Sequence, residues 1–368
     1  MNTRILQLCL SPNLGGLELY MQRLSLFLHS HAQTHLCIAE HSKLDAAFCE
    51  FPAIPKLQLR KHAWKNIFKN AKRLANYIDT NKIDVVHMHW TKDLPLCVFA
   101  KHLSQRKPKL IQSRHMNMTR FKSDFYHRHL YKNIDLMIAV TEQVKQQITR
   151  FVPDEICPPV KVSYIGAPKY KQLSKDAIQA LRQQYNLDNN FVIALAGRIE
   201  PAKGQALLVE ALEILDKPNV KIMLIGDAME EEYLQQFKSS IDIKGLTSQA
   251  VFTGFVNNVQ DLMAISDCVV LATDKETFGM VLIEAMHTGT AVLASNSGGP
   301  LEIITPNEDG LLFNSGDAAD LAAQLACYIE NEAIRQQLAH EGKAKALSKF
   351  ESNQQFSELL THVKQCTK

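Results

Sequence analysis

The sequence lacks a long hydrophobic run. Its longest apolar stretch near the start, Ile5 to Leu10, follows Arg4 and stops at Ser11-Pro12. A membrane-spanning helix needs about 20 apolar residues, and a secretory signal needs a longer apolar region than this one, so both are disfavoured. We therefore expect an intracellular, cytoplasmic protein.

Other patterns are missing too. The eight cysteines form no C-x-x-C pair and no metal-ligand spacing, which favours free, mostly buried thiols. No G-x-G-x-x-G fingerprint occurs, which disfavours a nicotinamide oxidoreductase, and no short repeat or low-complexity tract is visible. At 368 residues, with 46% hydrophobic and 21% charged residues, the composition is typical of a globular protein of roughly two domains.

Charge is divided unevenly along the chain. Residues 1–180 hold 27 Lys and Arg against 13 Asp and Glu, a net +14, whereas residues 181–368 have a net charge of −11. Summed charge steers association, so the first half is expected to face an anionic partner such as a lipid headgroup surface or an acidic acceptor. A merely solvated basic face explains the asymmetry equally well.

Short apolar runs alternate with longer amphipathic segments, which predicts β-α units and parallel sheets. The break at Gly166-Ala167-Pro168 predicts a boundary between a domain of residues 1–167 and one of residues 168–349, and the end of the chain reads as helices. The predicted strands are Ile5 to Leu10, His35 to Ala39, Asp84 to His89, Leu110 to Ser113, Leu136 to Thr141, Val162 to Ile165, Val192 to Gly197, Lys221 to Ile225, Ala250 to Thr253, Cys268 to Ala272 and Ala291 to Ala294.

Loops that follow parallel strands are where ligands bind. After the first strand, Gly15 and Gly16 stand at the mouth of a helix, where backbone N–H groups can meet an anion; a flexible turn is an equal alternative. In the second half, Arg198 and Lys203 lie between Gly197 and Gly204, just after a strand. A guanidinium fork and an ammonium converging on one pocket could neutralise a diphosphate.

A third loop carries two carboxylates. Glu276 precedes the predicted helix and Glu284 lies within it, so they stand at different heights and suit two hydroxyl-bearing parts of one extended ligand. The N–H groups of Phe278, Gly279 and Met280 begin that helix and could face phosphates. In a fourth loop, Gly298-Gly299 permits close backbone approach to a ligand or to the facing domain.

These motifs together resemble glycosyltransferase family 4. The resemblance rests on G-R-x-x-x-x-K-G at Gly197 to Gly204, the E-x7-E pair Glu276 and Glu284, G-G-P-L-E at Gly298 to Glu302, and Gly15-Gly16-Leu17-Glu18. It implies an α/β GT-B fold, in which two Rossmann-like doubly wound domains face each other across a cleft and a C-terminal helix, residues 350–368, returns to the first domain.

The resemblance also implies roles for individual residues. Arg198 and Lys203 would grip the donor diphosphate, Glu284 the ribose and Glu276 the donor sugar. The backbone at Phe255 and Val256 would border the nucleobase, and His115 matches a family histidine near the donor sugar. Members generally retain anomeric configuration without a metal; the absence of a D-x-D triplet agrees with this, so no metal and no other cofactor is expected.

Two features keep alternatives open. His87 and His89 end one strand and could point together, which allows a zinc pair, although no third ligand is near in sequence. The basic stretch Lys61 to Arg73, which includes Trp64 and Phe68, reads either as an amphipathic membrane-surface element or as a plain solvated helix.

We therefore expect a retaining, metal-independent glycosyltransferase. Its donor would be a nucleotide-diphosphate sugar and its acceptor a glycan or lipid-linked molecule of a bacterial envelope polysaccharide, such as lipopolysaccharide or capsule. Peripheral contact with the cytoplasmic face of an anionic inner membrane is an open possibility, and no nucleic-acid partner is expected. The rival functions are a nucleotide-sugar epimerase or hydrolase of the same fold, and an inactive nucleotide-sugar-binding partner.

Overall fold

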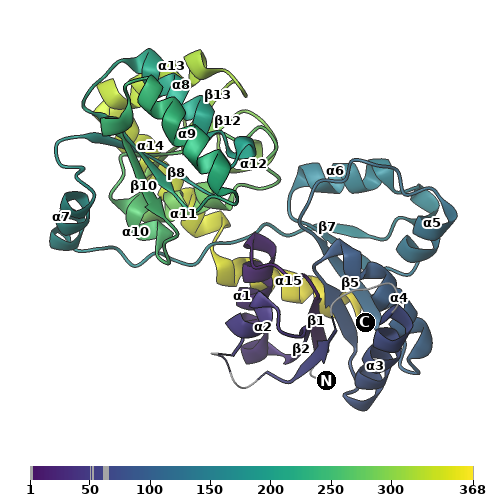
Figure 1. The fold of residues 1–368 in the computed structure, drawn as a ribbon. Coiled ribbons are helices and arrows are strands. Elements are labelled where there is room, and N and C mark those ends of the chain that lie inside the picture. Colours follow the sequence, from purple (N-terminus) through teal and green to yellow (C-terminus); the bar gives the residue numbers. More distant parts are fainter. Residues whose placement is uncertain (1–2, 50, 52–53, 61–65, 368) are drawn as a thin grey trace. The chain divides into compact units, whose positions relative to one another are not determined.

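The chain divides into two compact units (Figure 1). The computed structural model describes residues 3–49, 51, 54–60 and 66–367. Unit 1 comprises Met1–Ile165 and Asn353–Lys368, and unit 2 comprises Gly166–Ser352. Residues 61–65 of the basic stretch, including Trp64, lie outside the described residues. None of the helices in the described ranges is long and apolar enough to cross a membrane.

The described part of unit 1 forms a seven-stranded parallel sheet in the order β3-β2-β1-β4-β5-β6-β7. Its strands are β1 (Arg4–Cys9), β2 (Gln33–Ala39), β3 (Lys56–Leu59), β4 (Val85–Met88), β5 (Lys109–Arg114), β6 (Leu136–Ala139) and β7 (Val160–Val162). Its helices are α1 (Gly16–His31), α2 (Lys43–Ala47), α3 (Ile67–Thr80), α4 (Leu94–Leu103), α5 (Phe125–Tyr131), α6 (Glu142–Phe151) and α15 (Ser352–Cys366), with short 3₁₀ turns η2 (Thr91–Asp93) and η3 (Asp154–Ile156).

Unit 2, all of whose residues are described, contains a six-stranded sheet in the order β10-β9-β8-β11-β12-β13. Its strands are β8 (Phe191–Ala196), β9 (Val220–Ile225), β10 (Ala250–Gly254), β11 (Cys268–Leu271), β12 (Ala291–Ser295) and β13 (Leu311–Phe313). Its helices are α7 (Lys175–Gln184), α8 (Gln205–Leu215), α9 (Glu231–Ile243), α10 (Val259–Ala264), α11 (Met280–Thr288), α12 (Pro300–Ile303), α13 (Ala318–Glu330) and α14 (Glu332–Lys349), with 3₁₀ turns η4 (Pro201–Lys203) and η5 (Thr247–Gln249).

The central strands of both sheets are buried, which explains their continuous apolar runs. Val192, Ile193 and Ala194 of β8 and every residue of β11 are almost inaccessible. Crossover helices cover both faces of a parallel sheet, so its strands need apolar side chains on each side rather than on alternate positions. The α/β prediction of two Rossmann-like parallel-sheet domains is thus confirmed.

The errors in the predicted strands lie at the sheet edges. Strands β3 and β13 were not predicted, and β7, predicted at Val162 to Ile165, spans Val160–Val162. These three edge strands are only three or four residues long, so each apolar run is too short to tell from a loop. In β3, for example, Lys56 is exposed and only Leu59 is buried.

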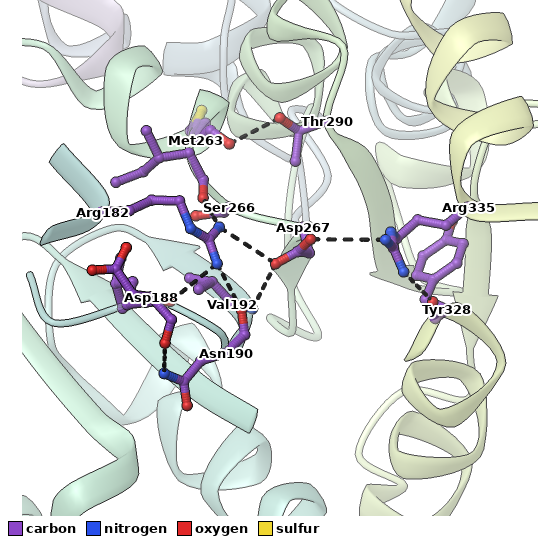
Figure 2. Close-up of polar contacts among 12 residues, drawn as sticks. Arg182, Asp188, Asn190, Val192, Met263, Ser266, Asp267, Thr290, Tyr328 and Arg335 are labelled. Atoms are coloured by element: carbon purple, nitrogen blue, oxygen red, sulfur yellow. Dashed lines mark hydrogen bonds and ion pairs between the residues drawn. The ribbon is translucent and has the colours of Figure 1, made fainter. Parts of the chain in front are cut away.

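Asp267 anchors the amino end of the unit-2 sheet (Figure 2). Its carboxylate accepts the backbone N–H of Val192 at 2.9 Å and forms ion pairs with Arg182 at 3.7 Å and Arg335 at 3.8 Å. Each arginine also donates to backbone carbonyls: Arg182 to those of Ile265, Leu187 and Asn190, and Arg335 to that of Tyr328. This network joins α7, β8, β11 and α14.

The last helix belongs to unit 1 although it comes from the far end of the chain. Leu359 and Val363 of α15 are fully buried, and the Phe356 ring lies 5.6 Å from the rings of Tyr20 and Phe27 in α1. The apolar face of α15 therefore completes the core that α1 begins.

Candidate functional site: the carboxyl edges of the two sheets

Arg198 and Lys203 both stand at the carboxyl end of β8, as predicted. Lys203 ends η4, and its side-chain stem passes over Gly197, where an added Cβ would lie 3.9 Å from Lys203 Cδ. Arg198 follows Gly197 directly and is 58% exposed. The Arg198 guanidinium contacts Glu200 at 3.1 Å and the Met229 sulfur at 3.0 Å.

Lys203 faces one of the two predicted carboxylates. Its Nζ lies 3.7 Å from Oε2 of Glu276, with 30% of the lysine and 23% of the glutamate side chain exposed. At this distance the two side chains form an ion pair but no hydrogen bond. The structure therefore brings Lys203 of the second loop and Glu276 of the third loop together, half open to solvent.

Gly204 explains why these two loops meet. It adopts φ +77°, and a Cβ there would stand 2.4 Å from the carbonyl oxygen of Ala272. A side chain is excluded both by the left-handed backbone and by this contact. The start of α8 can therefore lie directly against the end of β11, from which the loop of Glu276 departs.

The third loop runs into α11, whose N-cap is Gly279 at φ +103°. The N–H groups of Gly279 and Met280 are in the first turn of this helix, where no earlier carbonyl is available to them within the helix. Glu284 lies one turn further on and is half buried, between the buried Ile283 and Ala285.

The fourth loop, which follows β12, forms hydrogen bonds that hold the third loop in place. These bonds were not predicted from the sequence. Hydroxyls of Ser295 and Ser297 donate to the carbonyls of Thr273 (2.6 Å) and Asp274 (2.8 Å). The N–H of Gly299 donates to the carbonyl of Glu276 at 3.0 Å. A Cβ on Gly299 would stand 2.3 Å from the Phe278 carbonyl oxygen, so this glycine permits a close approach to the neighbouring loop of the same unit.

Asp227 is a second residue that sequence reasoning missed. Its carboxylate accepts the N–H of Phe255 at 3.1 Å, and its carbonyl accepts the N–H of Ile199 at 3.0 Å. It thereby ties the loop of Arg198 to the segment Phe255-Val256, where the Phe255 ring is 73% exposed. It follows Gly226 directly after the end of β9, and a polar residue in a loop after a parallel strand was the feature that could have indicated it.

In unit 1, Gly15 and Gly16 begin α1 as predicted, but Gly15 is already engaged. The carboxylate of Glu18 accepts its N–H at 2.8 Å, and Glu18 itself is buried. Gly16 is exposed, and a Cβ there would meet nothing within 4 Å. An anion at this end of α1 would therefore have to share it with a carboxylate.

His115 follows β5 and joins His87 and His89 in one cluster. Nδ1 of His89 lies 3.3 Å from Nε2 of His115, Nε2 of His89 lies 2.7 Å from Oε1 of Gln7, and His87 contacts Ser113 at 2.8 Å. Burial lowers the pKa of His115 to about 3, with the Arg114 guanidinium acting in the same direction. The cluster is thus a chain of neutral hydrogen-bonding rings at neutral pH.

The described ranges contain no group of three or more His, Cys, Asp or Glu side chains placed to hold a metal. His87 and His89 do point together, with ring centroids 4.4 Å apart, but Nε2 of His87 and both ring nitrogens of His89 contact neutral side chains, and Nδ1 of His87 is buried without a hydrogen-bond partner among the described residues. All eight cysteines are free.

Two family models match the sequence along both units. The model described as "Glycosyltransferase Family 4" covers residues 14–165, and the one described as "Glycosyl transferases group 1" covers residues 176–345. Curated relatives include N-acetyl-alpha-D-glucosaminyl L-malate synthase of Bacillus anthracis, 23% identical over 79% of this chain and 77% of its own length. Another is the capsular polysaccharide biosynthesis glycosyltransferase CapM of Staphylococcus aureus, 26% identical over 61% of this chain and 60% of its own.

Solved structures show the same architecture. HepE of Anabaena in complex with UDP has a TM-score of 0.86 and 25% identity, covering 98% of this chain and 100% of its own. A glycosyltransferase from Rickettsia africae has a TM-score of 0.90 and 20% identity, covering 100% and 99%. With both halves matched by family models and the fold shared over its whole length, the chain belongs to glycosyltransferase family 4 and is a glycosyltransferase of the GT-B fold.

Proposed function

We propose that this enzyme transfers a sugar from a nucleotide-diphosphate donor held by unit 2, with retention of anomeric configuration and without a metal ion. The observation that carries the proposal is the half-open pair of Lys203 and Glu276 beside Arg198 and the start of α11. Two cations and a helix amino terminus at one sheet edge supply what a diphosphate needs.

Binding of the donor would exchange weak contacts for strong ones. Lys203 and Arg198 are held at 3.7 and 3.1 Å by carboxylates that are themselves partly in water. A diphosphate offers several charged oxygens at hydrogen-bond distance, and charge-assisted bonds of this kind are the stronger ones. Glu276 would then be released from Lys203 to bind the donor sugar. Glu284 would bind the ribose, and Phe255-Val256 would border the base.

In the reaction, an acceptor oxygen bonds to the anomeric carbon as the bond from that carbon to the diphosphate oxygen breaks. The acceptor proton passes to the departing diphosphate on the same face, so no strong general base is required. Negative charge grows on the diphosphate during this step, and fixed cations aimed at growing charge lower the barrier by several kcal/mol. Lys203, Arg198 and the amides of α11 would provide them.

The acceptor is proposed to be a glycan or lipid-linked molecule of a bacterial envelope polysaccharide. Support comes from relatives named for capsule and for lipopolysaccharide core synthesis, the latter LpsD of Rhizobium meliloti, 29% identical over 44% of this chain and 45% of its own. The basic first half agrees with an anionic acceptor or membrane surface. Sedimentation with anionic but not with zwitterionic vesicles is the expected sign of peripheral membrane contact; equal sedimentation with both would contradict it.

The donor is tested by a thermal-shift panel of nucleotide sugars, because a ligand that binds only the folded state raises its apparent stability. UDP-sugars are the first probes, since the Anabaena neighbour is a UDP complex. Proton NMR of the reaction then follows the anomeric signal, which should keep its configuration, and an excess of EDTA should leave the rate unchanged. Conversion of donor without any acceptor would instead indicate an epimerase or hydrolase, and a donor panel without any shift would refute the proposal.

A further inference from the structure

Unit 1 contains a cavity that the proposed donor site does not use. It has a volume of about 400 Å³ and is lined by residues from the starts of α3 and α4, from helix α5 and from the loop before α5. These three helices are labelled in Figure 1. We call it the anion pocket and define it by Lys92, Lys122, Leu94, Pro95, Tyr126 and Leu130. Its size falls within the roughly 300–1,000 Å³ that is typical of small-molecule sites.

The cations around this pocket are not neutralised. Among the residues that the structure describes, neither Lys92, Lys122 nor Arg114 forms an ion pair. By contrast, many other cations of unit 1 do pair with carboxylates: Lys56, Lys101, Arg106, Lys109, Arg128 and Lys145.

Arg114 makes this imbalance costly. Only 8% of it is exposed, yet its guanidinium donates to neutral oxygens alone: the carbonyls of Met116 and Asn117 at 2.8 Å and the hydroxyl of Thr91 at 3.0 Å. Thr91 itself lines the pocket. A buried charge without a counter-charge is unfavourable, so an anion nearby would be stabilised.

Lys122 responds to the same surplus. Burial, followed by Arg114 and then Arg120, lowers its pKa, and only Asp124 acts against them. That carboxylate is committed elsewhere, since it caps α5 through the N–H of His127 and contacts the His127 ring.

The remaining wall suits a sugar ring. Leu94 and Leu130 are buried, Pro95 is half buried, and Tyr126 is 41% exposed. Apolar and aromatic surface with a few convergent polar groups is the usual lining of a site that holds a ring and fixes its orientation.

We propose that the anion pocket binds a negatively charged sugar, with its phosphate or carboxylate facing Lys92 and Lys122 and its ring against Leu94, Leu130 and Tyr126. This inference rests on the proposed function in taking that sugar to be part of the acceptor. It makes the acceptor an acidic glycan rather than a neutral one.

The test uses the full chain saturated with UDP, which fills the proposed diphosphate site in unit 2. Calorimetric titrations with glucose 6-phosphate, glucuronate, glucose and inorganic phosphate then compare ring and charge. Both charged sugars should bind at least about tenfold more tightly than glucose, as expected for one charge-assisted interaction. Glucose 6-phosphate should also bind more tightly than inorganic phosphate. Equal affinities of these two ligands would show a simple phosphate site and overturn the sugar assignment.

Charge-reversed variants locate the binding. Lys122→Glu, alone and together with Lys92→Glu, should lower the affinity for glucose 6-phosphate about tenfold or more. The matched control is Lys43→Glu, an exposed lysine at the start of α2 outside the pocket, which should change nothing. The affinity for UDP reports that each variant is folded. Equal weakening of binding by Lys43→Glu, or no binding of charged sugars by an unaltered chain that binds UDP, overturns this inference alone. An unaltered chain that binds no nucleotide diphosphate at all, UDP included, overturns the proposed function instead.

Discussion

Asp267 at the amino end of the unit-2 sheet and Glu276 at its carboxyl end are both carboxylates paired with cations, yet their surroundings differ. Asp267 also accepts a backbone N–H, and both of its arginines donate to backbone carbonyls (Figure 2). Glu276 faces a single lysine at 3.7 Å, and the nearby Arg198 is mostly exposed. Ion pairs woven into the backbone stabilise the sheet, whereas loosely held cations stay available to a ligand.

The largest effect is expected from Lys203→Ala. Loss of a cation that meets the departing diphosphate should lower donor turnover about 10²–10³-fold, as for removal of one oxyanion donor. The free energy of unfolding should hardly change, because the ion pair between Lys203 and Glu276 is long and partly exposed. The control Lys275→Ala removes a neighbouring lysine that is 86% exposed and should have little effect on turnover. Near-normal turnover by Lys203→Ala would remove its assignment.

At the opposite end, Asp267→Ala should destabilise unit 2 by about 2–3 kcal/mol, since a backbone N–H and two arginines lose a charged acceptor. Urea unfolding measures the loss. Asp267→Asn keeps an acceptor for the Val192 N–H and should cost less. The folded fraction of either variant should turn over donor normally, and a catalytic defect larger than that of Lys203→Ala would erase the distinction between the two ends.

Gly299→Ala should act on both stability and catalysis. The new Cβ would press on the backbone of Phe278, which costs about 1–3 kcal/mol in an overpacked site and displaces the loop of Glu276. Leu301→Ala, at an exposed position in the same short helix, is the control. Thermal unfolding and donor kinetics should both shift for Gly299→Ala; unchanged kinetics would mean that the fourth loop does not position Glu276.

The smallest effect is expected from Ser297→Ala, which removes one hydrogen bond to the Asp274 carbonyl. The loss should be about 0.5–1.5 kcal/mol. Turnover should fall by less than in Gly299→Ala, because the bonds from Ser295 and Gly299 persist. A larger defect than in Gly299→Ala would show that the Ser297 hydroxyl serves the ligand itself.

Most of the fold could be predicted from sequence because buried parallel strands are continuous apolar runs. The central strands β1, β8 and β11 were found in this way. The edge strands β3, β7 and β13 were missed or shifted because a strand of three or four residues looks like a loop, and in β3 the exposed Lys56 weakens the apolar pattern further.

The candidate site was predictable where residue type alone indicates chemistry. Arg198, Lys203 and Glu276 were named from their place after strands, and the structure puts Lys203 beside Glu276. Residues that act through the backbone were not named: Asp227 and Ser297 hold neighbouring loops by bonds that depend on tertiary approach. The glycines of the fourth loop were noted in the sequence. The contact of Gly299 with the backbone of Phe278 depends on the tertiary fold and could not be predicted.

The discontinuous make-up of unit 1 has a consequence for biosynthesis. A ribosome makes α15 only after the whole of unit 2, whose synthesis at about 5–20 residues per second takes roughly 10–40 s. Until then the nascent unit 1 lacks Leu359 and Val363, which are buried in the finished fold, and Phe356, whose ring packs against Tyr20 and Phe27 of α1. The earlier part of unit 1 therefore keeps an apolar surface exposed until α15 is made. In this state chaperone binding or aggregation competes with completion of the fold.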